Sequence, residues 1–283
     1  EAVLQASRAG LGRPVELDGN GWVDCGCGAR HWGRHGAAGL FLVVDEHVLL
    51  QLRPKWAHEG GTWAIPGGAR DSHESVVTTA LREAQEEAAI NPGLIEVVGV
   101  RRLQHPDWRY DTVIARAPVR PNVEEHAESV LLDWVALGDL AHWDLHQGFR
   151  ESLPDLLLPR ISLLIDAANV VGSRPDGWWH DRPGAAARLI EELGTIAGRV
   201  VELSGEPHLL ANLEVVVEGR AREVADPGLD SLVRVVRAAG AGDDTIADRS
   251  RNLKDVVVVT SDRGLRSRVP RSVPVSTLFG WLG

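Results

Sequence analysis

The chain has 283 residues, 44% of them hydrophobic, which is enough apolar material for two domains of ordinary size. Its formal net charge of −10 excludes non-specific nucleic-acid binding by the whole surface, so any nucleic-acid contact requires a local basic patch. No apolar run approaches membrane-spanning length and no signal peptide is visible, so we expect no membrane partner. Cys25 and Cys27 lie too close together to build a disulfide framework, which favours a reducing cytoplasm.

Residues 1–35 are irregular and glycine-rich, and they contain a group of potential zinc ligands. Two thiolates and two imidazoles can hold Zn²⁺ in a tetrahedral site, and one short stretch contains all four: Cys25, Cys27, His31 and His35. One loop must then supply every ligand. The alternative interpretation is a pair of reduced thiols beside surface imidazoles.

The next segment predicts two strands, 38–44 and 47–53, followed by a long loop and a short strand at 63–65. Arg53 and Lys55 are candidates for contacts with phosphate. Trp56 either stacks on a substrate base or packs against the protein, whereas we expect Trp63 to belong to the core.

Residues 68–90 predict a glycine turn followed by one helix that ends near residue 88. Asp71 and Glu74 have the spacing of a capping box, which places the helix start at Asp71. Apolar residues recur at helical spacing and predict the buried stripe: Val77, Ala80, Leu81, Ala84 and Ala88. Beside them, three carboxylates at i, i+3 and i+4 crowd together: Glu83, Glu86 and Glu87. Either they form a solvated acidic face, or they hold a hard divalent cation such as Mg²⁺.

The spacing within this segment resembles the signature box of Nudix hydrolases. The match comprises Gly68, five residues, Glu74, seven residues and the run Arg82-Glu83-Ala84-Gln85-Glu86-Glu87. The resemblance implies that the three Glu side chains, with the loop at Gly68, bind Mg²⁺ or Mn²⁺, and that Arg82 orients a carboxylate. One position departs from the family, which has Gly where this chain has Ala89. Ala can adopt the left-handed conformation at a cost of about 1–2 kcal/mol, and Asn91-Pro92-Gly93 can still stop the helix.

Strands at 94–103, 110–117 and 130–135 and a helix at 137–158 complete a first domain, residues 1–155. Strand, loop and box in this order resemble the Nudix fold, an α/β/α sandwich around a mixed sheet. Three acids between the last two strands either supply a further metal ligand or general base, or form a solvated turn: Glu124, Glu125 and Glu128.

Residues 156–283 alternate between strands and helices, which predicts a second domain with a parallel α/β sheet. We expect strands at 161–165, 213–217 and 256–259, and helices at 183–197, 228–239 and from 240. Ligands bind outside the carboxyl ends of parallel strands, where Asp166 and Asp262 fall, and Asp243 and Asp244 could converge on the same point. The alternative is that these aspartates cap helices.

The second half resembles the NYN branch of the PIN-like nucleases through three motifs, IDAANVV, GAGDDTIAD and VVVVTSDRGL. The resemblance implies that the same four aspartates bind metals that activate water on a phosphodiester, with Asn169 in the same pocket. With the local basic residues named below, it leads us to expect a ribonuclease that acts on single-stranded RNA. Trp178 and Trp179 stack bases or pack in the core. Basic residues gather near the last acid: Arg249, Arg251, Lys254, Arg263, Arg266, Arg268 and Arg271.

These features together predict a Mg²⁺-dependent Nudix enzyme that cleaves a nucleoside diphosphate linked to another moiety, fused to a metal-dependent ribonuclease. Two alternatives remain open. The Nudix domain could sense a nucleotide and regulate the second module, or the second module could bind RNA without cutting it.

Overall fold

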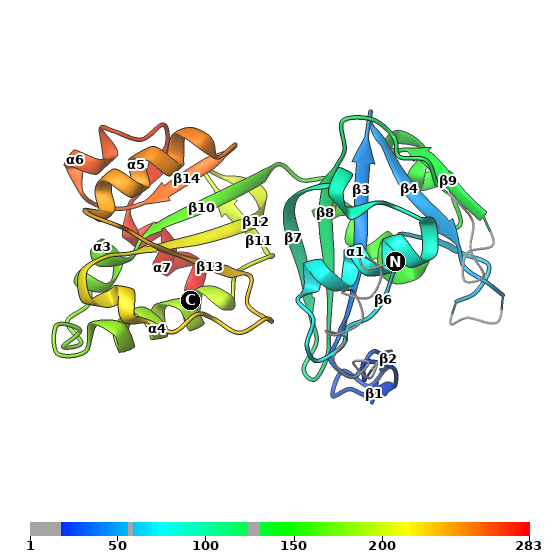
Figure 1. Ribbon diagram of the computed structural model, residues 1–283, viewed down its shortest axis with the longest axis horizontal. Helices are drawn as coiled ribbons and strands as arrows, with labels where there is room; N and C mark the ends of the chain where they lie inside the picture. The colour runs from blue at the N-terminus through cyan, green and yellow to red at the C-terminus, as the bar shows by residue number, and fades with distance from the viewer. Residues whose placement is uncertain (1–17, 56–58, 124–130) are drawn as a thin grey trace, which may run out of the picture.

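The structure is a computed structural model that describes residues 18–55, 59–123 and 131–283 of the chain. Two large sheets, each with its own helices, lie side by side (Figure 1). Four residues considered above lie outside the described ranges: Trp56, Glu124, Glu125 and Glu128.

The first sheet has seven strands in the order β5-β4-β3-β8-β7, with β6 paired to β3 and β9 to β4. The strands are β3 (Ala37–Val44), β4 (His47–Leu52), β5 (Trp63–Ala64), β6 (Gly67–Ala69), β7 (Glu96–Gln104), β8 (Arg109–Arg116) and β9 (Leu131–Ala136). Strands β3 and β8 run parallel and the other pairs antiparallel, so the sheet is mixed, as predicted.

Two helices cover opposite faces of this sheet. Alternate side chains of a strand point to opposite sides, so the apolar residues of β3 form a core on each face. Leu40 and Leu42 pack with α1 (Val76–Ala88), while Phe41 packs with Phe149 of α2 (Gln147–Leu156). The single helix predicted at 137–158 is instead the short helix η2 (Leu137–His142) followed by α2. A further turn, η1 (Pro92–Leu94), follows α1, and a hairpin, β1 (Trp22–Asp24) with β2 (Arg30–Trp32), precedes the sheet.

Helix α1 begins one turn later than the sequence predicts. The carboxylate of Asp71 accepts from the Gly19 N–H instead of capping the helix, and Ser75 Oγ accepts from the Thr78 N–H as the N-cap. The helix ends as expected. Ala89 adopts the left-handed conformation (φ 56°, ψ 24°), and its N–H reaches the Ala84 carbonyl.

The second sheet has six strands in the order β11-β12-β10-β14-β15, with β13 paired to β12. They are β10 (Arg160–Asp166), β11 (Val200–Leu203), β12 (Glu206–Val217), β13 (Val233–Arg237), β14 (Val256–Val259) and β15 (Ser272–Val273). All pairs are parallel except β11 with β12, so this sheet is mixed. The helices are α3 (Ala167–Gly172), α4 (Arg182–Gly194), η3 (Gly219–Glu223), α5 (Gly242–Asn252), α6 (Arg263–Arg266) and α7 (Val275–Leu282).

The helix predicted at 228–239 is wrong, because this segment contains β13. Its sequence, VRVVR, is rich in β-branched valine, which packs well on a pleated surface, and it extends the sheet beside β12. The residues before β13 form a loop that contacts the first half of the molecule.

The two halves meet along β7 and β12. A Cβ on Gly99 would lie 2.4 Å from the Ala211 Cβ, so glycine is required for this close approach. Asn212 Nδ2 donates to the Val98 carbonyl at 2.7 Å. Leu209 and Ala211 also pack in the same apolar cluster as Phe149. The junction is therefore a packed interface and not a simple linker.

Candidate active sites

Helix α1 brings the three predicted acids of the box to one face beside β6. Glu83 and Glu87 are buried, whereas the Glu86 side chain is 59% exposed. Glu87 Oε2 accepts from the Gly67 N–H at 2.7 Å and from Gln51 Nε2 at 2.8 Å. Sequence reasoning did not find Gln51, which reaches Glu87 from β4 on a separate strand.

Gly68 permits this arrangement by its lack of a side chain. A Cβ at this position would lie 2.6 Å from the carboxylate of Glu83, which is closer than real atoms approach. The glycine therefore lets the β6 backbone and the Glu83 carboxylate share one small volume.

Arg82 links the acids into one network. Its guanidinium donates to Glu74 at 2.8 Å and 3.0 Å, to Glu83 at 2.7 Å and to Glu86 at 3.0 Å. The hydrogen bond to Glu74 raises the Arg82 pKa. Burial raises the Glu74 pKa, but the bonds from Arg82 and Thr79 outweigh it and hold the pKa below its ordinary value.

The donor set fits a hard divalent cation. Three carboxylates share the Arg82 guanidinium and Glu87 adds a fourth negative charge, and an excess of negative charge on partly buried oxygens is the environment that Mg²⁺ or Mn²⁺ favours. Glu83, Glu86 and Glu87 are the residues that would hold it.

Arg53 is half-buried directly after β4, and Lys55 is exposed on the loop that follows. Desolvation and the nearby Glu87 charge raise the Tyr110 pKa, and the Arg53 charge opposes them. Trp63 is half-buried against the apolar cluster of α2 and contacts Trp143, with ring centroids 4.7 Å apart.

The predicted zinc ligands are only partly brought together. His35 is separate, with its Nε2 3.4 Å from Asp18 Oδ2. The remaining three, Cys25, Cys27 and His31, form a group with His105, from the loop between β7 and β8.

A second group of acids lies at the carboxyl ends of the parallel strands in the C-terminal region. Asp166 ends β10, Asp262 follows β14, and Asp243 lies in the first turn of α5. They line a hollow of about 260 Å³ together with Asn169 and Glu218. Glu218 was missed, although it directly follows β12 and the rule that selected Asp166 could have found it.

Two of these aspartates also cap helices, so that alternative holds in part. Asp166 Oδ1 accepts from the Asn169 N–H, and Asp262 Oδ1 accepts from the Leu265 N–H. Asp166 is buried, and its Oδ2 accepts from Thr260 Oγ1 at 2.9 Å. Asp243 does not cap α5, because Ala241 holds the N-cap position.

Burial and mutual repulsion disfavour the ionised forms of the acids in this hollow, and the charge of Arg268 offsets this only in part at Asp243. Desolvation raises the Asp166 pKa, and desolvation with the charge of Asp262 raises the Asp243 pKa. Asp244 is outside the hollow and pairs with Arg268 at 2.5 Å, so the prediction that it joins the other acids is wrong. Adjacent helical residues point about 100° apart, which separates these two carboxylates.

The aromatic and basic residues predicted for RNA have mixed placements. Trp178 packs against the core and lies under Arg182, whereas Trp179 is 56% exposed. Neither lines the acidic hollow. Arg249 and Arg251 pair with Glu214 and Asp248, while Arg263, Arg266 and Arg271 are exposed.

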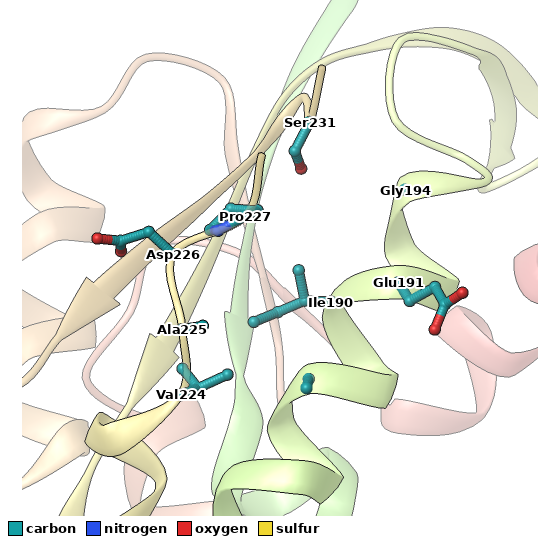
Figure 2. Close-up of a pocket in the computed structure, with 9 residues that line it drawn as sticks. Ile190, Glu191, Gly194, Val224, Ala225, Asp226, Pro227 and Ser231 are labelled. Atoms are coloured by element: carbon teal, nitrogen blue, oxygen red, sulfur yellow. The ribbon is translucent and has the colours of Figure 1, made fainter. Parts of the chain in front are cut away.

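A larger hollow, of about 330 Å³, lies between α4 and the segment 224–231. Figure 2 shows Ile190 pointing toward Val224 and Pro227, while the carboxylates of Glu191 and Asp226 point away. With its charged groups turned outward, this hollow offers apolar contact and no converging chemistry.

The box lies within the part of the chain that a family model matches. The family model of the NUDIX domain matches residues 33–156. A putative 8-oxo-dGTP diphosphatase 3 of Mycobacterium tuberculosis is 43% identical over 149 residues, which is 49% of this chain and 69% of that protein. A nucleoside triphosphate pyrophosphatase/Nudix hydrolase fusion protein of Bifidobacterium longum is 43% identical over 159 residues, 52% of this chain. The chain spans only 33% of the length of that fusion protein.

Among solved structures, a Nudix hydrolase from M. smegmatis, RenU, is 42% identical and covers 49% of this chain and 92% of its own, with a TM-score of 0.45. The mycobacterial relative, of which this chain covers more than two thirds, shows that the chain belongs to the Nudix family, with residues 33–156 as its Nudix domain. Within the described ranges, no helix combines the length and apolar character needed to cross a membrane.

Proposed function

We propose that the Nudix domain is a Mg²⁺- or Mn²⁺-dependent pyrophosphohydrolase that cleaves a nucleoside diphosphate linked to another moiety. The observation that carries the proposal is the arrangement of the acids on α1: Glu83 and Glu87 lie against the β6 backbone, and Arg82 joins Glu83 and Glu86 to Glu74. When bound, the metal neutralises the pyrophosphate and activates a water.

The chain's own residues position this chemistry. Arg82 and the Gly67 N–H hold the carboxylates in fixed directions, so the acids need little reorganisation when a substrate arrives. Glu86 is the exposed member and therefore the one that a solvent-borne ligand meets first. Arg53 and Lys55, directly after β4 and in the loop that follows, are the residues that we expect to contact phosphate.

The substrate class follows from the site and from the names of relatives. The mycobacterial relative is named as a putative 8-oxo-dGTP diphosphatase, so oxidised deoxyguanosine triphosphate heads the candidates. The test is a panel of nucleoside triphosphates, including 8-oxo-dGTP, with dinucleoside polyphosphates and nucleotide sugars, in Mg²⁺ and in excess chelator. We expect metal-dependent release of a nucleotide product from at least one class. Full turnover in chelator would contradict the proposal.

A second function is favoured by the acidic hollow of the C-terminal region. We propose that residues 156–283 form a separate PIN-like domain that cuts single-stranded RNA with a divalent metal. Asp166, Asp243 and Asp262 come from separate elements and converge with Glu218, and such carboxylates need a cation. The exposed arginines after Asp262 would dock the phosphate chain.

The matched pair Asp243→Asn and Asp244→Asn tests the nuclease. The two residues are adjacent in α5, but only Asp243 lines the hollow. With the full chain, labelled unstructured RNA and Mn²⁺, we expect Asp243→Asn to lose cutting and Asp244→Asn to keep it. RNA binding without cutting by the wild-type chain would favour the RNA-binding module. Cutting that begins only when a nucleotide is added would favour the sensor alternative.

A further inference from the structure

We propose that Cys25, Cys27, His31 and His105 form a structural Zn²⁺ site that fastens the N-terminal hairpin to the loop between β7 and β8. This ligand set differs from the one that the sequence predicts, because His105 replaces His35. The site is separate from both acidic sites and uses a different class of ligand.

The four side chains converge as a tetrahedral site requires. Their ligand atoms, two Sγ atoms and two ring nitrogens, all lie within 4.8 Å of one another. Cys27 Sγ is 3.2 Å from His31 Nε2. Zinc–sulfur and zinc–nitrogen bonds of ordinary length place neighbouring ligand atoms roughly 3.3–3.8 Å apart, so small side-chain adjustments would complete the coordination.

The backbone around the cysteines is shaped to turn both thiols to one side. Two hydrogen bonds close the turn between the strands of the hairpin. The Cys25 N–H donates to the Ala29 carbonyl at 3.0 Å, and the Gly28 N–H donates to the Cys25 carbonyl at 2.9 Å. Gly28 has φ +88°, which suits glycine, so the turn depends on this residue. Cys25 is buried, and Cys27 lies at the surface.

Independent contacts fix the loop that carries His105. The Gly26 N–H donates to Asp107 Oδ2 at 2.7 Å, which joins the cysteine turn to this loop. The His105 N–H bonds to the Trp108 carbonyl at 2.8 Å. The His31 ring stacks on Trp108, with centroids 4.3 Å and planes 9° apart. Such supporting contacts orient metal ligands before the metal arrives.

The chemistry of the set selects zinc. Thiolate and imidazole ligands prefer Zn²⁺ to Mg²⁺, and four protein ligands leave no open position for a reacting water. A closed site of this kind contributes folding free energy and not catalysis.

The site would also support the loop before the Nudix helix. The Arg34 N–H bonds to the Gly19 carbonyl at 2.8 Å, and the Gly19 N–H bonds to Asp71 Oδ1 at 2.7 Å. The Arg70 N–H in turn bonds to the Gly36 carbonyl at 3.0 Å. The segment after the hairpin is therefore hydrogen-bonded to the loop between β6 and α1. Ordering the hairpin would also order this loop, which leads into the helix that carries the three Glu side chains.

Elemental analysis of the full-length chain, purified without chelator, tests the proposal, with His105→Asn and His35→Asn as a matched pair. We expect about one zinc per chain in the wild type and in His35→Asn, and loss of the metal in His105→Asn and Cys25→Ser. Zinc-free wild-type protein, or zinc lost in His35→Asn and kept in His105→Asn, would overturn the proposal.

A second measurement does not depend on the folding of variants. Zinc is removed from the wild-type chain with chelator and replaced by Co²⁺, whose visible spectrum reports coordination. The proposal requires intense tetrahedral bands and a thiolate-to-cobalt charge-transfer band. An octahedral spectrum without the thiolate band would refute it.

Discussion

In the acidic hollow of the C-terminal region, the ionised carboxylate of Asp243 destabilises the folded chain, and a single substitution can remove this effect. The raised pKa of Asp243 means that its ionised form is disfavoured in the folded chain. Above that pKa the charge lowers stability, and removing it restores stability. In chelator at neutral pH, Asp243→Asn should therefore raise Tm, whereas Asp244→Asn, which loses the pair with Arg268, should not.

Thermal melts with and without Mn²⁺ complete this test. Added metal should raise Tm more in the wild type than in Asp243→Asn, because the variant lacks one of the converging carboxylates. An Asp243→Asn variant that melts below the wild type in chelator would show that the Asp243 charge does not destabilise the folded chain.

Gly68 gives a second prediction at the residue scale. A Cβ there would meet the Glu83 carboxylate at 2.6 Å, so Gly68→Ala should displace that carboxylate and reduce kcat/KM on the order of 100-fold. Gly138→Ala is the control, because a Cβ at Gly138 meets nothing within 4 Å. Equal activity in the two variants would mean that the close approach at Gly68 does not matter.

At the scale of elements, helix α1 is stabilised at one end and strained at the other. Ser75 caps its start, but Ala89 pays the steric cost of a left-handed residue at its end. Ala89→Gly removes about 1–2 kcal/mol of steric strain from the folded chain. Glycine also makes the unfolded chain more flexible, which lowers stability by about 0.4–1 kcal/mol. We therefore expect the free energy of unfolding to rise by about 0.5–1 kcal/mol.

Urea denaturation measures this gain, with Ala88→Gly as the control one residue earlier. Ala88 is the last residue of the helix and is fully buried, and glycine there should cost about 1 kcal/mol. A loss of stability in both variants would contradict the account of the C-cap.

Most elements could be predicted because their patterns are local. The box helix follows from apolar spacing, and the strands of the first sheet follow from runs of valine and leucine. The helix predicted at 228–239 was wrong because pairing with β12, a tertiary contact, reinforces the local β-strand preference of its valines. Asp71 failed as the cap because the Gly19 N–H, distant in sequence, takes its carboxylate.

The same distinction separates the predicted site residues from the missed ones. Asp166, Asp243 and Asp262 follow a rule about strand ends, and Glu218 obeys the same rule. His105 obeys no such rule, because only the folded β7–β8 loop brings it to the cysteines. A search confined to one short stretch of sequence therefore chose His35.

At the scale of the whole molecule, one aspartate of the C-terminal region links the two halves. Asp230 Oδ1 lies 2.7 Å from Arg70 Nη2 and 2.6 Å from Arg109 Nη2, both in the Nudix domain. The Arg70 side chain is buried, and its desolvation lowers its pKa. Arg70 also belongs to the loop that leads into α1, so the junction touches the box directly.

Asp230→Asn should therefore destabilise the full chain by about 1–2 kcal/mol, because buried Arg70 loses its counter-charge. Asp226→Asn is the matched control, since Asp226 lies in the same loop but pairs with Arg237 at the surface, and it should cost about 0–0.5 kcal/mol. Denaturant midpoints of the two variants give the comparison. Equal midpoints would mean that Asp230 does not hold the halves together.

The central claim is that the acidic face of α1 is the hydrolytic centre, and Glu86→Gln tests it most directly. Glu86 is exposed, so the substitution should leave the fold intact, as circular dichroism can verify. We predict a loss of kcat of at least about 100-fold on the best substrate of the panel, beyond the 10–100-fold typical of residues that only support a ligand. Glu191→Gln, an exposed site on α4, should keep wild-type turnover. Full activity in Glu86→Gln would contradict the account.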